Sequence, residues 1–321
     1  MDYIVADSNG IERGYLVASR KIDIDIGDTN DFELTLDADD YRKRGYGFGY
    51  RFYQEGTEYG GIFEDIKVVT KNNSVVIRGF TWRGLLSQKI ILPPSSLAYL
   101  TVSGDANAVI AEVLGDAFGD LYAVESQPSG ISISYQFDRF TDILTGLTKM
   151  LSRADARLNI YFSGGQVHLE ALPVTDWSEQ LEYGTDNHVS FTIRDYRQGI
   201  NHLVCLGSGQ LTDRQIIHLY LQEDGSIGST QYYTGLQERM AVYDYSGAED
   251  LDSLREGGLD RFAELLNYQE MSIAIQDIPV ELGDIVGGRE RITGMVIKKP
   301  VTNKVIKVTG NKVEISYKVG D

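Results

Sequence analysis

The stretch KIDIDIGDTNDFELTL, residues 21–36, alternates apolar and polar side chains on both sides of a short polar segment. That segment, GDTND, has the composition of a turn, because glycine, asparagine and aspartate accept the backbone angles that turns require. A period of two residues is typical of a strand with one buried face. The stretch therefore predicts a β-hairpin, and its buried face consists of Ile22, Ile24, Ile26, Phe32, Leu34 and Leu36.

Strand-like patterns continue to about residue 99. In GYGFGYRFY, residues 45–53, the alternation places Tyr46, Phe48, Tyr50 and Phe52 on one predicted face. The glycines fall on the other face, where a second backbone could approach closely. IFEDIKVVT and SVVIRGF follow as two strands joined by a turn at Asn72 and Asn73. Strands of this length in succession predict a small antiparallel sandwich or barrel.

The apolar period becomes helical after about residue 100. Residues 106–118 carry apolar side chains at the spacing of an amphipathic helix, with Ser103 or Asp105 as its N-cap and Gly119 as its stop. The same spacing predicts a second helix over residues 140–151. RLNIYF and QVHLEAL then flank the turn Ser163-Gly164-Gly165 and predict a hairpin. Together these elements predict a compact α+β unit.

Strands return after residue 173, interrupted by a helical stripe over residues 248–267 that the Gly257-Gly258 pair is expected to weaken or kink. Near the end, GMVIKKPVTNKVIKVTG repeats the order of GIFEDIKVVTKNNSVVIRG: strand, Asn-containing turn, strand, glycine. This echo indicates two related β units. The predicted fold is mainly β, with an α+β insert. It comprises a first β domain over 1–99, an α+β domain over 100–172 and a second β domain over 173–321.

The charge and the cysteine count exclude several classes of protein. The 30 Lys and Arg residues against 47 Asp and Glu residues give a formal net charge of −17, which disfavours sequence-independent binding to nucleic acid. One cysteine, Cys205, allows neither an intrachain disulfide nor a zinc site built from cysteines. The start MDYIVADSNG lacks the pattern of a secretion signal, and no apolar run approaches a membrane span. We expect folding in a cytoplasm without membrane insertion.

No motif in the sequence carries recognisable chemistry. The richest group of polar residues, Asp186, His188, His202, Ser208 and His218, lacks a nucleophile elbow, and with His168 it lacks the helical histidine spacing of a metal site. DIDIGDTND has alternate carboxylates, but it departs from a calcium loop at the positions of the glycine and the final glutamate. Glu64 and Asp65 are adjacent in a predicted strand and point to opposite faces, so they make no glycosidase pair. We therefore predict no catalytic, cofactor-binding or metal-binding residue.

The order of β unit, α+β insert and second β unit resembles the baseplate hub proteins of phage tails. The resemblance rests on KIDIDIGDTNDFELTL, on YGGIFEDIKVV followed by SVVIRGFTWRGLLSQKII, and on ELGDIVGG with the final hairpin. Its most specific part is the run from Gly60 to Ile91, in which a strand pair leads into Gly79-Phe80, Leu85-Leu86 and then Pro93-Pro94. The likeness covers nearly the whole chain.

The resemblance implies a structural protein of the virion rather than an enzyme. Such hubs are trimers whose two tube-type β domains per chain form a pseudo-sixfold ring. The ring joins the sixfold tail tube or distal tail protein to a threefold spike or tip and encloses the channel, through which DNA passes without specific binding. Assembly in the cytoplasm of a bacterial host is implied, with any lytic activity on another protein. The alternative is a tail-associated cell-wall hydrolase or a carbohydrate-binding β protein, since 20 tyrosines suit sugar stacking.

Overall fold

A computed structural model describes residues 2–16, 21–178, 189–196, 198–248, 250–266, 268–275, 279–289, 296–310 and 312–320. The chain forms two compact units, one of Met1–Thr192 with Met271–Asp321 and one of Ile193–Glu270. The fold is mainly β with several antiparallel sheets, as predicted. The division into domains over 1–99, 100–172 and 173–321 stays a prediction.

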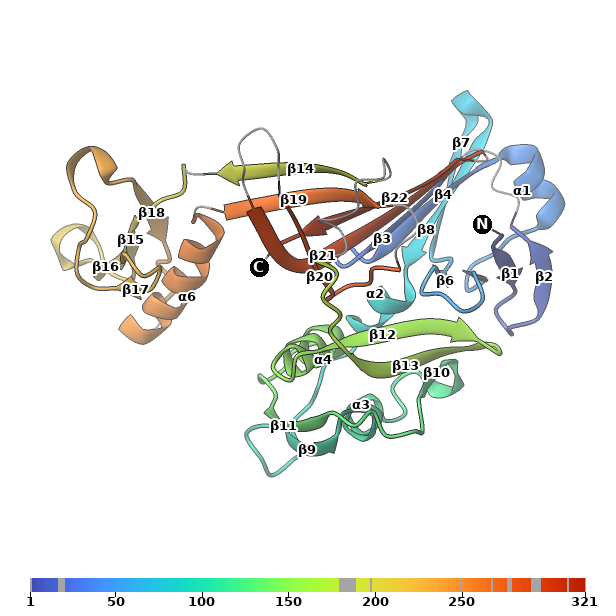
Figure 1. Ribbon diagram of the computed structural model, residues 1–321, viewed down its shortest axis with the longest axis horizontal. Coiled ribbons are helices and arrows are strands. Elements are labelled where there is room, and N and C mark those ends of the chain that lie inside the picture. The colour runs from blue at the N-terminus through green and yellow to red at the C-terminus, as the bar shows by residue number, and fades with distance from the viewer. Residues whose placement is uncertain are drawn as a thin grey trace. The chain divides into compact units, whose positions relative to one another are not determined.

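The largest sheet has nine strands and unites the two ends of the chain (Figure 1). Its order is β14-β19-β22-β21-β3-β4-β8-β7, and β20 pairs with β21. The predicted hairpin is confirmed as β3 and β4, and β3 pairs in turn with β21, where Ile24 lies opposite Ile306. The strands are β3 (Lys21–Ile26), β4 (Asp31–Asp37), β7 (Asp65–Val69), β8 (Ser74–Phe80), β14 (Val189–Tyr196), β19 (Tyr268–Ile275), β20 (Ile285–Arg289), β21 (Val296–Thr309) and β22 (Lys312–Val319).

The second strand–turn–strand unit, which was predicted near the C-terminus as a repeat of the first, is wrong. β7 and β8 are joined by a short 3₁₀ turn, η1 (Thr70–Asn72), whereas residues 296–309 form the single strand β21. A bulge between Val301 and Asn303 replaces the predicted turn. The reason is that the Asn303 amide donates to the Asp25 carboxylate on β3, at 3.0 Å from Nδ2 to each oxygen, and so holds the strand in the sheet.

A second, four-stranded sheet has the order β2-β1-β5-β6 and packs on an aromatic core. Its strands are β1 (Ile4–Ala6), β2 (Glu12–Tyr15), β5 (Arg51–Tyr53) and β6 (Gly60–Ile62), and helix α1 (Ala38–Arg44) follows β4. The strand predicted over residues 45–53 is wrong in its first half, where Gly45 and Gly49 adopt left-handed φ angles of 64° and 76°. The alternation is broken there, so Phe48 is 67% exposed while Phe52 is fully buried.

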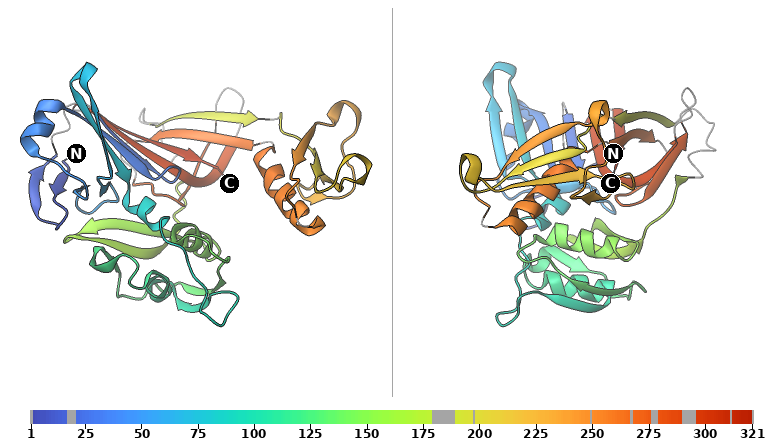
Figure 2. Two further views of the ribbon diagram at one scale, coloured as in Figure 1. Left: turned by 180° about the vertical axis from the view of Figure 1, so that it is seen from behind. Right: turned by 90° about the vertical axis from the view of Figure 1, so that its left-hand side faces the viewer.

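The α+β part of the first unit packs around a core to which helix α2 contributes Trp82, Leu85 and Leu86, and α2 lies beside the β12–β13 hairpin (Figures 1 and 2). Strands β10, β13 and β12 form one sheet, and β11 pairs with β9. The predicted hairpin at Ser163-Gly164-Gly165 is confirmed. The elements are α2 (Trp82–Leu86), β9 (Thr101–Asp105), α3 (Ala106–Leu114), η2 (Gly119–Leu121), β10 (Tyr122–Val124), β11 (Ser132–Gln136), α4 (Ile143–Ser152), β12 (Ala156–Ser163) and β13 (Gln166–Pro173).

Both helices predicted in this part exist, with shorter bounds. Asp105 is the N-cap of α3, since its side chain accepts from the Asn107 N–H. The helix ends before Gly115, whose φ of 46° leaves the right-handed helical region, rather than at Gly119. Helix α4 begins after Asp142, whose carboxylate accepts from the Thr145 N–H, so Phe140 lies outside it and is 54% exposed.

The second unit is a four-stranded sheet with one helix on one of its faces (Figure 2). The strand order is β17-β16-β15-β18, in which β15 (His202–Leu206) pairs parallel with β18 (Met240–Asp244). β16 (Ile216–Leu221) and β17 (Ile227–Gly228) complete it, with 3₁₀ turns η3 (Leu211–Asp213) and η4 (Gly235–Gln237).

The helix of the second unit, α6 (Leu251–Glu264), runs without interruption through the Gly257-Gly258 pair. The glycine pair therefore does not end the helix. Gly258 lies against the sheet, and a Cβ atom there would meet Cys205 Sγ at 2.6 Å. The missing side chain thus allows the helix to approach the strands closely, and this packing outweighs the low helix propensity of glycine.

Helix α2 gives a direct test of how tightly the first unit is packed. A Cβ atom on Gly84 would lie 2.1 Å from the Asn30 carbonyl oxygen, which is backbone and cannot move aside. We expect Gly84→Ala to lower the free energy of unfolding by about 1–3 kcal/mol or more in urea titrations, despite the better helix propensity of alanine. Gly320→Ala, whose Cβ would meet nothing closer than 4.0 Å, is the matched control and should change stability little. Equal stability of the two variants would contradict the close packing.

Candidate functional site

The three described histidines do not form a single group: His168 belongs to the first unit, and His202 and His218 belong to the second. Asp186 and His188 lie outside the described residues. His168, on β13, contacts Glu125 at 2.9 Å from Nδ1 to Oε1 and stacks on Tyr161. Hydrogen bonds from Tyr161 and His168 lower the pKa of the Glu125 carboxyl. These three side chains form a hydrogen-bonded group on one face of the sheet.

His202 and His218 do come together, on the neighbouring strands β15 and β16. His202 Nε2 lies 2.8 Å from His218 Nδ1, and His202 Nδ1 lies 2.7 Å from Glu238 Oε1. Ser208 lies in the loop after β15, where its carbonyl accepts from the Gln215 N–H. Two ring nitrogens at this distance share one proton, so at least one imidazole accepts there. The side chains of His202, His218 and Glu238 thus connect β15, β16 and the segment before β18.

The carboxylates of DIDIGDTND serve the backbone of the β3–β4 turn. Asp25 Oδ1 accepts from the N–H groups of Asp28 and Thr29, at 3.2 and 3.0 Å, and from the Asn303 amide. Among the residues that the structure describes, no group of three or more histidine, cysteine or acidic side chains is placed to hold a metal ion. The oxygens of Asp25 act here as the cap of a turn.

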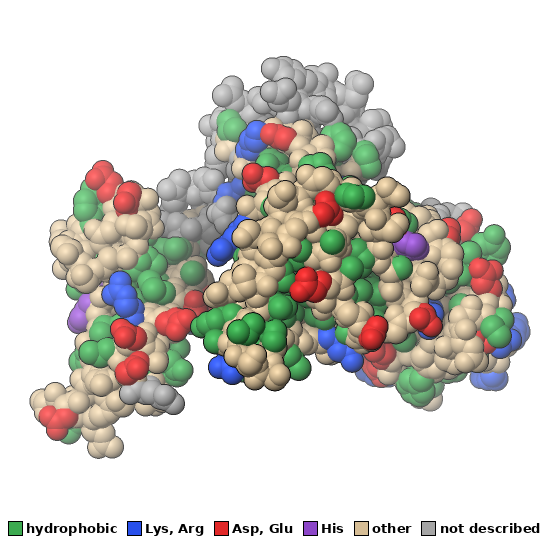
Figure 3. Space-filling view, turned by 90° about the horizontal axis from the view of Figure 1, so that it is seen from below, with side chains coloured by type: hydrophobic (Ala, Val, Ile, Leu, Met, Phe, Trp, Pro, Cys, Tyr) green, Lys and Arg blue, Asp and Glu red, His purple; other side chains and the backbone are tan. Residues whose placement is uncertain are grey.

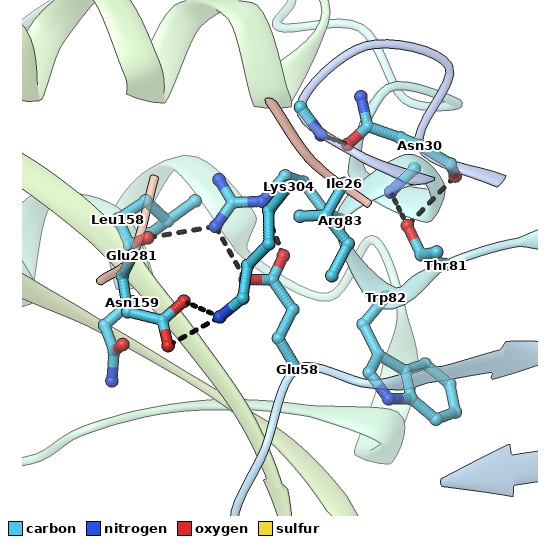
Figure 4. Close-up of polar contacts among 12 residues, drawn as sticks. Ile26, Asn30, Glu58, Thr81, Trp82, Arg83, Leu158, Asn159, Glu281 and Lys304 are labelled. Carbon is cyan, nitrogen blue, oxygen red and sulfur yellow. Dashed lines mark hydrogen bonds and ion pairs between the residues drawn. The ribbon is translucent and has the colours of Figure 1, made fainter. Parts of the chain in front are cut away.

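A buried ion pair is the most unusual chemical feature of the first unit (Figure 4). Arg83, on α2, donates to both oxygens of Glu58, from Nε to Oε1 at 2.5 Å and from Nη2 to Oε2 at 3.0 Å. Nη2 also donates to the Leu158 carbonyl on β12, at 3.1 Å. Both charged side chains are buried, so the pair connects α2, the loop before β6 and β12 inside the protein.

A second ion pair lies beside the first. Lys304 Nζ, from β21, is 2.9 Å from each carboxylate oxygen of Glu281, and its side chain is 3% exposed. The ammonium group also lies over the rings of Tyr59 and Tyr317, at 5.0 and 5.7 Å from their centroids. Figure 4 shows Arg83, Glu58, Lys304 and Glu281 grouped together. We call these four residues the buried charge cluster.

Burial governs the electrostatics of the buried charge cluster. Loss of water raises the pKa of the Glu58 carboxyl, although Arg83 acts to lower it, and Glu281 raises it further. The folded protein therefore favours a neutral Glu58 more than water does. Two acids and two bases balance one another in formal charge, which permits Arg83, Glu58 and Lys304 to be buried, while the Glu281 side chain is 33% exposed.

The buried charge cluster was not predicted from the sequence, although a signal was present. Arg83 stands within FTWRGLL, a segment whose other side chains are apolar or small. Arginine in such a segment is rarely buried without a partner. Its partners Glu58 and Leu158 are 25 and 75 residues away, so nothing in the local pattern could name them.

A cavity in the second unit has a volume of about 460 Å³ and is lined by Arg194, Tyr196, Gln198, Ile200, Glu264, Leu265 and Leu266. Glu264 is the one carboxylate among these seven residues, and it pairs with Arg261. A glycosidase needs two carboxyl groups on either side of the scissile bond. The cavity therefore gives no support to the alternative hypothesis of a cell-wall hydrolase.

Many of the tyrosines considered for sugar stacking lie in the cores. Tyr53 stacks on Phe162 with ring centroids 3.9 Å apart, and Trp82 stacks on the same ring at 5.4 Å. Burial raises the pKa of Tyr317 to about 12. Among the tyrosines whose burial the structure describes, seven are buried: Tyr3, Tyr46, Tyr53, Tyr59, Tyr122, Tyr135 and Tyr317.

The buried charge cluster generates a test with a defined pH dependence. Arg83→Met leaves Glu58 buried without its main partner, and we expect a loss of about 3–5 kcal/mol near pH 7 in urea unfolding. The variant also loses the cation that lowers the pKa of Glu58, so this pKa rises further. A carboxyl group whose pKa is raised by folding stabilises the fold below its ordinary value of 4.5, and this stability is lost as the pH rises through the raised value.

The loss for Arg83→Met should accordingly be much smaller near pH 4 than near pH 7. Arg42→Met is the matched control, because Arg42 pairs with Asp39 on the surface, where the two side chains are 72% and 64% exposed. It should change stability little at either pH. A loss for Arg83→Met that is independent of pH would contradict the role given to Glu58.

The chain was compared with known proteins by sequence and by structure. No protein-family model matches it, and no curated protein matches it by sequence. Among the described residues no helix is long and apolar enough to cross a membrane.

Solved structures that are similar to nearly the whole chain include two prophage tail proteins. One is prophage tail protein gp18 from Listeria monocytogenes, which is 15% identical, with 99% of this chain and 94% of that chain covered and a TM-score of 0.50. The other is the 43 kDa tail protein of prophage MuSo2 from Shewanella oneidensis, which is 12% identical, with 99% and 98% covered and a TM-score of 0.52. At these identities the likeness concerns the fold. The chain therefore has the fold of phage tail proteins, as the sequence resemblance predicted.

Proposed function

We propose that the chain is a structural baseplate hub at the distal end of the tail tube of a phage or phage-derived particle. The observation that carries the proposal is the structural likeness to two prophage tail proteins over 99% of the chain. The likeness extends across both compact units rather than one. It favours a part of the virion tail with a structural role.

In the proposed assembly three copies form a ring that joins the sixfold tube or distal tail protein to a threefold spike or tip. Exposed apolar side chains support an assembly of this kind, because contiguous apolar surface on a folded chain commonly marks a contact site. Ile90, Leu92, Leu97 and Tyr99 are 45–68% exposed in the segment 90–100, which carries no charged residue. Apolar side chains gather in places on the face drawn in Figure 3.

The excess of acidic over basic residues fits a channel through which DNA moves without binding. Acidic side chains are spread over the face in Figure 3 rather than gathered in one place. Three copies would carry a formal charge of −51, three times the −17 of one chain. A surface of this sign repels phosphate groups and releases no counterions from DNA.

The proposed ring predicts a homotrimer, in solution or on assembly. Native mass spectrometry of the purified protein and of assembled particles measures this directly, against the 35.8 kDa mass of one chain. We expect three copies per ring. A monomer at high concentration, together with particles that contain no ring of this chain, would contradict the hub.

The charge of the proposed channel predicts no measurable binding to duplex DNA at physiological salt. A filter-binding assay with random-sequence duplex checks this, and a basic DNA-binding protein serves as the positive control. Repulsion should persist as salt is lowered, because the 47 acidic residues outnumber the 30 Lys and Arg residues. Binding that strengthens steeply at low salt would overturn this account of the charge.

A further inference from the structure

The strand β18 lies at one end of the four-stranded sheet in the second unit. Among the described residues β15 is its one neighbour in that sheet. Its sequence, MAVYD, contains neither lysine nor proline, the residues that commonly protect an exposed strand edge from pairing. The strand is therefore open to pairing along its outer side.

The register shows which backbone groups face that outer side. The His202 N–H donates to the Arg239 carbonyl at 3.1 Å, and the Tyr245 N–H donates to the Leu206 carbonyl at 2.8 Å. In a parallel pair the bonding residues of a strand alternate, so Ala241 and Tyr243 also face β15. The N–H and C=O groups of Met240, Val242 and Asp244 consequently point away from the sheet.

The side chains of the same three residues are exposed. Met240 is 56% exposed and Val242 is 66% exposed. Asp244 pairs with Arg214, and its side chain is still 59% exposed. These side chains lie on the face opposite α6, because the alternate residues Leu203, Cys205 and Leu219 of the sheet pack with the helix. An apolar strip with free backbone groups beside it fits an added strand.

Charge decides which strand suits this edge. Residues 193–270 contain 13 acidic residues, six arginines and no lysine, a formal charge of −7. A second copy would bring the same acidic unit and be repelled, whereas a basic segment would be attracted. We propose that β18 accepts an extended, basic strand of another protein, with apolar residues at alternate positions against Met240 and Val242. This inference does not depend on the hub function.

The experiment titrates the full chain into a fluorescein-labelled nonapeptide of alternating valine and lysine and measures anisotropy at physiological salt. Val242→Pro removes an outward N–H but no bond to β15, so we expect the fold to persist and binding to weaken about tenfold or more. Val242→Thr keeps the N–H and the branched shape, and it should bind like the wild type. A peptide of alternating valine and glutamate should not bind.

Hydrogen exchange of the wild-type protein keeps the test decisive if Val242→Pro fails to fold. The amides of Val242 and Asp244 should exchange fast in the free protein and slow on addition of the valine–lysine peptide, while those of Ala241 and Tyr243 are protected throughout. Absence of peptide binding, equal binding to Val242→Pro, or equal binding of the glutamate peptide would overturn the proposal. So would a dimer in sedimentation that Val242→Pro abolishes, since the edge would then serve a second copy.

Discussion

The buried contact between Arg83 and Glu58 is the interaction on which the first unit depends most. A guanidinium and a carboxylate removed from water lose several kcal/mol of hydration, which only close and complete pairing offsets. Arg83 meets this condition through Glu58 and the Leu158 carbonyl, and Lys304 with Glu281 adds a second balanced pair nearby. Five parts of the chain must therefore be in place together before the charges are satisfied. Such a group favours one arrangement of the α+β part on the sheet over looser ones.

Close backbone contact, like the buried charges, favours one arrangement of the parts of the first unit. Helix α2 carries Arg83 and lies so near the β3–β4 turn that Gly84 has no room for a side chain. The Thr81 hydroxyl caps the helix by accepting from the Gly84 N–H, and it donates to the Asn30 carbonyl. On the other side of that turn, Asp25 accepts from Asn303 of β21. The turn thus links the α2 region with the C-terminal strands, so that both ends of the chain share one sheet.

Many polar groups of the described residues stabilise the fold. Its buried charges are paired with one another, and its carboxylates cap turns and helices, as Asp25, Asp105 and Asp142 do. Two surfaces are available for contact with other molecules. One is the uncharged apolar segment at residues 90–100 in the first unit, and the other is the outer edge of β18 in the second unit. A protein organised in this way suits assembly, in keeping with a fold that it shares with prophage tail proteins.

The local elements could be predicted from the order of the residues, because alternation and helical spacing depend on neighbouring positions. The pattern predicted the β3–β4 hairpin, the helix with Ser103 or Asp105 as its N-cap, and the turn at Ser163-Gly164-Gly165. Tertiary structure decided the rest: Asn303 lies in a strand because Asp25 binds it, and Gly258 stays helical because it packs on Cys205. Arg83 and Glu58 were equally beyond prediction, since no local pattern specifies a partner 25 residues away. Contacts between distant segments override local preference wherever they bury more surface or satisfy a charge.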